Sequence, residues 1–64
     1  MKCKILIRRN GATHQIQTVE LDILPPTDAS IRVNDPQNGF TDARVVRIDW
    51  DVVVTPPEVE IIVE

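Results

Sequence analysis

Residues 2–24 have the sequence KCKILIRRNGATHQIQTVELDIL, and this stretch decides the fold. In its first part Cys3, Ile5 and Ile7 alternate with mostly basic residues, which is the two-residue period of a strand with one buried face. Asn10-Gly11 follows, a pair that supplies the two positive-φ positions of a two-residue hairpin turn. The stretch therefore predicts a β-hairpin whose first strand buries its odd-numbered positions.

The strand after this turn, about Thr13 to Leu24, changes its apolar face part-way along. Ile16 lies on the even-numbered face, whereas the apolar residues from Val19 to Ile23 lie on the odd-numbered face. A strict period of two cannot accommodate that change. We therefore expect a bulge near Gln17-Thr18, or a bend of the strand from one sheet into another, which is how small barrels close.

Three further strands are expected, separated by clusters of Pro, Asn, Asp and Gly. They are Ser30 to Asn34, Ala43 to Val54, and an alternating strand from residue 58 onward. Pro25-Pro26 and Pro56-Pro57 end the strands before them, because proline cannot donate to a ladder. In the longest strand we expect one buried face, formed by Val46, Ile48, Trp50, Val52 and Val54.

A chain of 64 residues is at most one domain, and we take residues 1–64 as a single small β domain. Five short strands, one of them bent, predict a small five-stranded antiparallel barrel. The pattern resembles the SH3-like class, whose first and last strands lie together, but it carries no family motif. The alternative is a curved β-meander sheet that is completed by dimerisation.

The charges support a contact between the first and last strands. Residues 1–9 carry four bases and no acid, whereas residues 48–64 carry five acids and no base. Opposite charges that face each other across two strands stabilise the pairing. We therefore expect the two terminal strands to lie side by side, within one chain or between two.

The chain lacks the residue sets that most catalytic sites need. Gly11 and Gly39 are its only glycines, too few for a phosphate-binding loop. Cys3 and His14 are its only cysteine and histidine, and the expected hairpin places them several pairs apart, so neither a Cys–His dyad nor a zinc site is expected. We expect no enzyme activity and no cofactor.

The loop after residue 34 contains three oxygen donors, Asp35, Asn38 and Asp42. Their spacing departs from that of a calcium loop, since Pro36 interrupts it and no Glu follows at the required place. We expect local side-chain bonds of Asp35 and Asn38 that form turns, and no metal site. Whether the three bind any ion is left open.

Two binding surfaces are conceivable. Apolar residues out of phase with the buried faces would form a small outer patch that binds an unknown protein or a second copy: Leu6, Val45, Val53 and Ile62. Basic residues could form a patch for nucleic acid: Lys2, Lys4, Arg8, Arg9, Arg44 and Arg47. A pI near 4.9 and an aromatic content of 3% disfavour nucleic acid. We expect a non-catalytic protein-binding or self-associating module, with a nucleic-acid-associated barrel as the alternative.

The expected location is the cytoplasm, in a small bacterial or phage accessory protein. Met1 to Arg9 is basic at both ends with only three consecutive apolar residues, which does not fit a signal peptide. Cys3 has no partner in the chain for a disulfide, as is usual in a reducing compartment. No apolar run approaches the roughly 20 residues that span a bilayer, so no membrane partner is expected.

Overall fold

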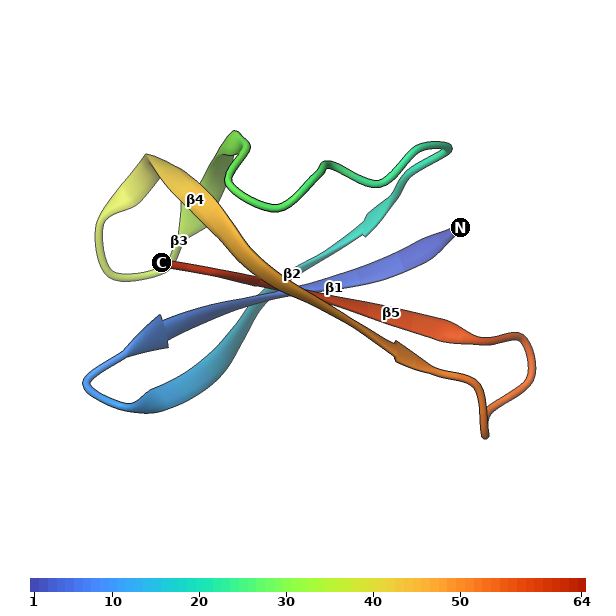
Figure 1. The fold of residues 1–64 in the computed structure, drawn as a ribbon. Coiled ribbons are helices and arrows are strands. Elements are labelled where there is room, and N and C mark those ends of the chain that lie inside the picture. Colours follow the sequence, from blue (N-terminus) through green and yellow to red (C-terminus); the bar gives the residue numbers. More distant parts are fainter.

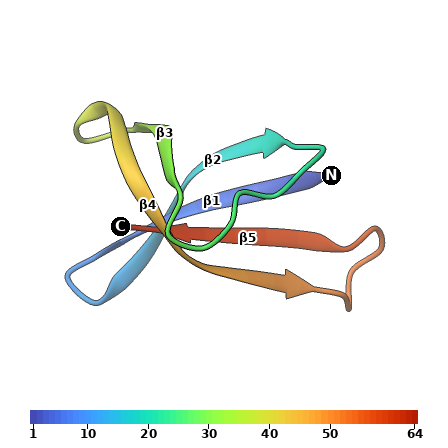
Figure 2. The ribbon, with the colours of Figure 1, turned by 45° about the horizontal axis from the view of Figure 1, so that its top comes forward.

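The computed structural model describes residues 1–64, and it contains five strands and no helix. The strands are β1 (Lys2–Arg9), β2 (Ala12–Glu20), β3 (Ser30–Asp35), β4 (Gly39–Asp51) and β5 (Glu58–Val63). They form one sheet in the order β2-β1-β5-β4-β3, which curls into a half-barrel (Figures 1 and 2). The expected five-stranded all-β fold is confirmed. The chain offers no helix with the length and apolarity to cross a membrane.

The β1–β2 hairpin follows the sequence closely. Asn10 and Gly11 have φ of 52° and 78°, as a two-residue turn with positive φ at both positions requires. The register then slips, because Ile5 pairs with Gln17 while Leu6 pairs with Gln15. Ile16 is therefore the extra residue of a bulge, next to the predicted position, and β2 ends at Glu20, before the expected Leu24.

The first and last strands pair, as the charges predicted, but they run parallel. The β1–β5 register extends from Cys3 opposite Val59 to Ile7 opposite Val63. The expectation of an antiparallel sheet throughout is therefore wrong at this one pairing. Because the strands point the same way, the two chain ends lie at opposite ends of the sheet (Figure 1).

The core lies inside the curl, where the inner faces of the central strands meet. The core residues that come from β1 and β5 are the alternating residues that the sequence predicted to be buried. Nine residues form it, none more than 5% exposed: Cys3, Ile5, Ile7, Val33, Ala43, Val45, Val59, Ile61 and Val63. Small and β-branched side chains thus build the core without any aromatic ring.

The buried face predicted for the long strand is confirmed at Ile48, which is half-buried against the core, and is wrong from Trp50 onward. A register slip between Val45 and Arg47 places Val45 in the core and still leaves the even-numbered residues beyond it facing inward, since Ile48 stands opposite Ile61. Trp50 stands opposite Val59 but is 56% exposed. The physical reason is the length of β4. Strand β3 pairs with it only as far as Arg44, so beyond that point β4 is itself a sheet edge. Val52 and Val54 lie past the end of the strand, exposed at 71% and 39%.

The predicted outer patch of Leu6, Val45, Val53 and Ile62 does not form as one surface. Val45 precedes the register slip and lies in the core. Ile62 is on the outer face, but it is only 2% exposed, between its register partners Leu6 and Arg47 in the middle of the sheet. Leu6 is half-buried, and only Val53 is freely exposed, at 91%.

Candidate functional site

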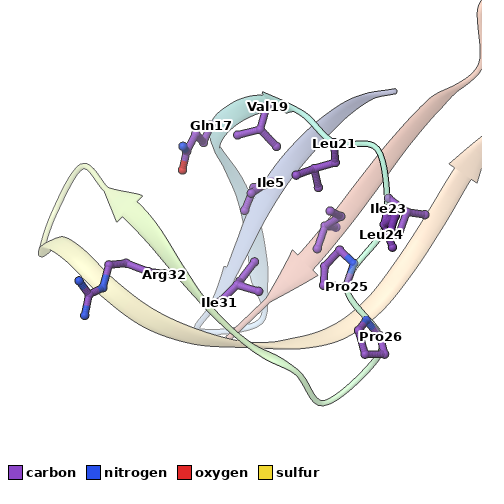
Figure 3. Close-up of a pocket in the computed structure, with 11 residues that line it drawn as sticks. Ile5, Gln17, Val19, Leu21, Ile23, Leu24, Pro25, Pro26, Ile31 and Arg32 are labelled. Carbon is purple, nitrogen blue, oxygen red and sulfur yellow. The ribbon is translucent and has the colours of Figure 1, made fainter.

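The open side of the half-barrel contains an apolar groove of about 430 Å³ (Figure 3). Its floor includes Ile5 and Ile61 of the core, and its walls come from β2, from β3 and from the segment that joins them. Leu21 and Leu24 of that segment are half-buried against the core. Most of the lining is therefore aliphatic, and this is the largest concave surface of the protein.

The groove exists because β2 and β3 never pair. They are the two edges of the sheet, and one side-chain hydrogen bond joins them, from the backbone N–H of Asn34 to Oε1 of Gln17 at 3.3 Å. The segment between them cannot close the gap as a sixth strand, since Pro25 and Pro26 lack the N–H that a ladder needs. The barrel is left open along this side.

Backbone hydrogen bonds hold both ends of the connecting segment. At its start, the N–H of Leu21 donates to the carbonyl of Met1 at 2.9 Å. At its end, Asp28 N–H donates to Val45 O at 2.7 Å, and Val45 N–H donates to Ala29 O at 2.9 Å. The groove wall is thus tied to Met1, directly before β1, on one side and to β4 on the other.

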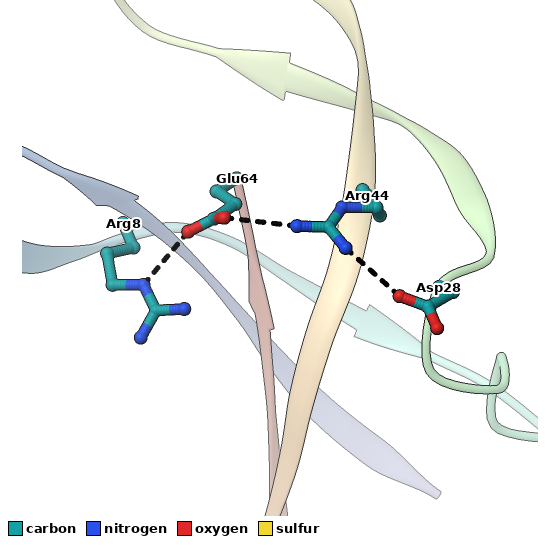
Figure 4. A network of polar contacts seen from close by, with 4 residues as sticks. All are labelled: Arg8, Asp28, Arg44 and Glu64. Carbon is teal, nitrogen blue, oxygen red and sulfur yellow. Dashed lines mark hydrogen bonds and ion pairs between the residues drawn. The ribbon is translucent and has the colours of Figure 1, made fainter.

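A polar network reinforces the second of these attachments (Figure 4). Arg44 donates to Oδ1 of Asp28 at 3.0 Å and to Oε1 of Glu64 at 3.2 Å. Glu64 also accepts from Nε of Arg8 at 3.1 Å. One chain of charges therefore links β1, the residue after β5, β4 and the loop before β3. The groove is a preformed feature of the fold, since its wall is fixed by bonds on both sides.

The strand edges beside the groove are open to a partner strand. In an edge strand, alternate N–H and C=O groups point away from the sheet and have no ladder partner. Charged side chains usually protect such edges from other chains. From Ala12 to Val19, β2 carries no Lys, Arg, Asp or Glu, so its edge lacks that protection.

A second exposed apolar feature lies at the connection of β4 to β5. We call Val52, Val53 and Val54 the tip; their exposed fractions are 71%, 91% and 39%. Acidic residues flank the tip on both sides, and Asp51 stands directly opposite Glu58 in the register. The tip is thus a convex apolar loop with an acidic base.

The six basic residues of the predicted patch do not form a free cationic surface. Five of them are in ion pairs: Lys4 with Glu58, Arg8 with Glu64, Arg9 with Asp35, Arg44 with Asp28 and Glu64, and Arg47 with Asp49. The hydrogen bond from Lys4 to Glu58 raises the pKa of the Lys4 amine. Only Lys2 has no acidic partner within ion-pair distance. These acids neutralise most of the positive charge that binding of phosphate groups would need.

The residues considered for chemistry lie apart or are occupied. Cys3 is buried opposite Val19, and burial raises the pKa of its thiol, whereas His14 is exposed opposite Ile7. The predicted separation of Cys3 and His14 is confirmed. No three His, Cys, Asp or Glu side chains come together at a spacing that could hold a metal ion.

Asp35 forms the local turn bonds expected of it. Its Oδ1 accepts from the N–H of Gln37 at 3.0 Å, and its Oδ2 accepts from Nδ2 of Asn38 at 3.1 Å and from the guanidinium of Arg9. Asp42 points elsewhere, toward Arg32. Asp35 is the one buried charged residue, and all its contacts serve the β3–β4 turn and its attachment to β1.

The groove itself was not predicted from the sequence. Val19, Leu21 and Ile23 share a period of two, and this pattern assigned them to a strand that would end at Leu24. The structure instead ends β2 at Glu20 and leaves Ile23 84% exposed at the groove. A usable signal was present, since an apolar run that ends in Pro25-Pro26 cannot supply the hydrogen bonds of an inner strand.

Comparison with known proteins gives no relative from which a function could be transferred. No family model matches the chain, and neither a curated protein nor a solved structure does.

Proposed function

We propose that this protein is a non-catalytic interaction module that binds a short apolar segment of a protein in the groove between β2 and β3. The observation that carries the proposal is the groove itself, which is aliphatic, is fixed at both ends and lies between two unpaired strand edges. Its volume of about 430 Å³ falls within the roughly 300–1,000 Å³ of ordinary ligand pockets.

The apolar lining of the groove and the open edge of β2 both contribute to such binding. Apolar side chains of the segment would be removed from water against Leu21, Leu24 and Ile31. The backbone of the segment would bond to the open edge of β2, as in recognition by strand addition, where the main chain provides affinity and side-chain pockets provide specificity. A bound segment would thereby fill the gap that leaves the barrel open.

The alternative function, nucleic-acid binding, has less support. It needs a basic face and stacking aromatic residues. Five of the six candidate cations are already paired, and the two aromatic residues, Phe40 and Trp50, belong to opposite ends of β4. We therefore base the proposal on the groove.

Selection of peptides from a random phage-displayed library on the immobilised full chain tests the proposal. We expect enriched peptides that contain several apolar residues and bind the wild type. Ile23→Asp places a charge at the groove without disturbing the core, because Ile23 is 84% exposed, and it should abolish this binding. Phe40→Asp is the matched control, since Phe40 is 78% exposed and outside the groove.

Amide chemical shifts of the labelled protein locate the bound peptide. Binding should shift the signals of Gln17, Val19 and Ile31, which line the groove. The proposal is wrong if no peptide is enriched over an empty support. It is equally wrong if the enriched peptides bind Ile23→Asp as well as the wild type and shift signals on another face.

We further propose that the module works in a reducing cytoplasm, in a bacterium or a phage-infected cell. The free, buried thiol of Cys3 supports a reducing compartment. Fractionation of the source cells and immunodetection of the protein would check this; recovery from an extracytoplasmic fraction would contradict it.

A further inference from the structure

We infer that the groove of one copy of this chain receives the tip of a second copy, and that the two copies exchange their tips reciprocally. The inference rests on the proposed function, because it uses the same groove. It adds the identity of the bound segment, namely Val52, Val53 and Val54 of another molecule.

The first support is that one small chain presents two complementary apolar surfaces. The groove is concave and aliphatic, whereas the tip is convex and ends in Val53, which is 91% exposed. Contiguous exposed apolar surface on a small protein generally marks an interaction site. A single contact between two copies covers one groove and one tip together.

The second support is the placement of the two surfaces. The tip and the start of the segment that forms the groove wall lie at the same end of the molecule as the N-terminus, and the segment runs from there toward β3 (Figures 1 and 2). A two-fold axis at this end would bring each tip toward the groove of the other copy. Such an interface uses the same patch on both subunits and is closed, so it ends in a dimer instead of a fibre.

The third support is charge. Two pairs of acids stand opposite each other at the base of the tip, Asp51 with Glu58 and Asp49 with Glu60. Glu58 and Asp49 are in ion pairs with Lys4 and Arg47, whereas Asp51 and Glu60 have no basic partner. Two tips packed on each other would bring these acids together, which is unfavourable. The groove contains no carboxylate, and its one charged residue, Arg32, is paired with the exposed carboxylate of Asp42. Charge therefore favours the pairing of tip with groove over the pairing of tip with tip.

Light scattering over a concentration series, with the full-length chain, provides the basic measurement. We expect the wild type to reach the mass of a dimer. Val53→Asp at the tip and Ile23→Asp at the groove should each raise the dissociation constant about thirtyfold or more, the effect of losing an interface hot spot. Both positions are highly exposed, so both variants should fold, and Phe40→Asp should dimerise like the wild type.

A mixing experiment separates reciprocal exchange from other dimers. Val53→Asp retains an intact groove, and Ile23→Asp retains an intact tip. An equimolar mixture of the two monomeric variants should therefore regain a dimer through one intact tip–groove contact. A dimer disrupted by only one of the two substitutions, or a mixture that stays monomeric, overturns the inference.

Failure of this inference can be told apart from failure of the proposed function. A wild type that stays monomeric at every concentration contradicts tip exchange, but the groove would still be a binding site if library peptides bind it and Ile23→Asp prevents this. The blocked peptide Asp51–Thr55 is the direct probe. It should shift the signals of Gln17 and Ile31 in the Val53→Asp variant, and the absence of any shift would contradict the tip as occupant.

Discussion

Lys4 of β1 and Glu58 of β5 form an ion pair, with 2.9 Å between Nζ and Oε2, across the one parallel pairing of the sheet. The pair lies near the start of both strands, and Arg8 with Glu64 forms a second pair near their ends. These two ion pairs join the basic first strand to the acidic end of the chain, which is the contact that the charge distribution predicted. In the parallel register Glu58 lies beside Lys4, whereas an antiparallel β5 would place Glu58 near Arg8 instead.

The Lys4–Glu58 pair predicts a loss of stability at alkaline pH. The hydrogen bond to Glu58 raises the pKa of Lys4 in the folded state above the unfolded value of about 10.4. The stabilisation is therefore complete below that pH and disappears as the pH rises through the folded-state pKa. Urea denaturation between pH 7 and 11.5 should show the difference between wild type and Lys4→Met shrinking toward zero above about pH 10.4.

The Cys3 thiol also affects stability over this pH range, so the cysteine is replaced in both proteins that are compared. Its pKa is raised by burial, so it also causes a loss of stability as the pH rises above the ordinary cysteine value of about 8.5. Comparing Cys3→Ala with the Cys3→Ala, Lys4→Met double variant isolates the lysine. Stability curves that stay parallel throughout would mean that the ion pair contributes nothing in solution.

The buried carboxylate of Asp35 predicts a specific loss of stability. Asp35→Ala would leave the N–H of Gln37 and the guanidinium of Arg9 without their acceptor, at a cost of about 1–3 kcal/mol in unfolding free energy. Asp42→Ala is the control, because its pair with Arg32 is solvent-exposed and should change stability by less than about 0.5 kcal/mol. Equal losses for the two variants, measured by urea denaturation at pH 7, would contradict this role of Asp35.

Local patterns predicted much of this fold. The alternation of Cys3, Ile5 and Ile7 located a buried face, and Asn10-Gly11 located a turn, since both depend only on near neighbours in the sequence. The pairing of the first and last strands followed from charge. Its direction did not, because opposite charges attract in either orientation unless the register is known.

The wrong predictions of burial have a common physical cause. Val45, Trp50 and Ile62 were assigned from periodicity alone, but burial also depends on which strand lies alongside. Val45 lies before a register slip, and Trp50 lies beyond the end of β3. Ile62 is covered because β5 is central. The groove was missed for the same reason, since it forms between two strands that the sequence does not mark as edges.

The sheet topology predicts which isoleucine the core depends on. Ile61 is fully buried between Ile5 and Ile48, so Ile61→Ala should cost about 2–5 kcal/mol. A domain of this length has a total stability of roughly 3–10 kcal/mol, so much of the variant should be unfolded. Ile48 is only half-buried, and Ile48→Ala should cost about half as much or less. Thermal denaturation followed by circular dichroism measures both, and a larger loss for Ile48→Ala would contradict the position of Ile48 on an open edge of the sheet.

Trp50 provides an optical test of the open edge of β4. It is 56% exposed, so its fluorescence in the folded monomer should resemble that of indole in water and should be quenched readily by acrylamide. Unfolding in urea should therefore change its emission wavelength little, unlike that of a core tryptophan. The Val53→Asp variant keeps the protein monomeric for this measurement, because Trp50 lies beside the tip. Blue-shifted emission that is protected from acrylamide in this variant would show that Trp50 is covered and that β4 is not an open edge beyond Arg44.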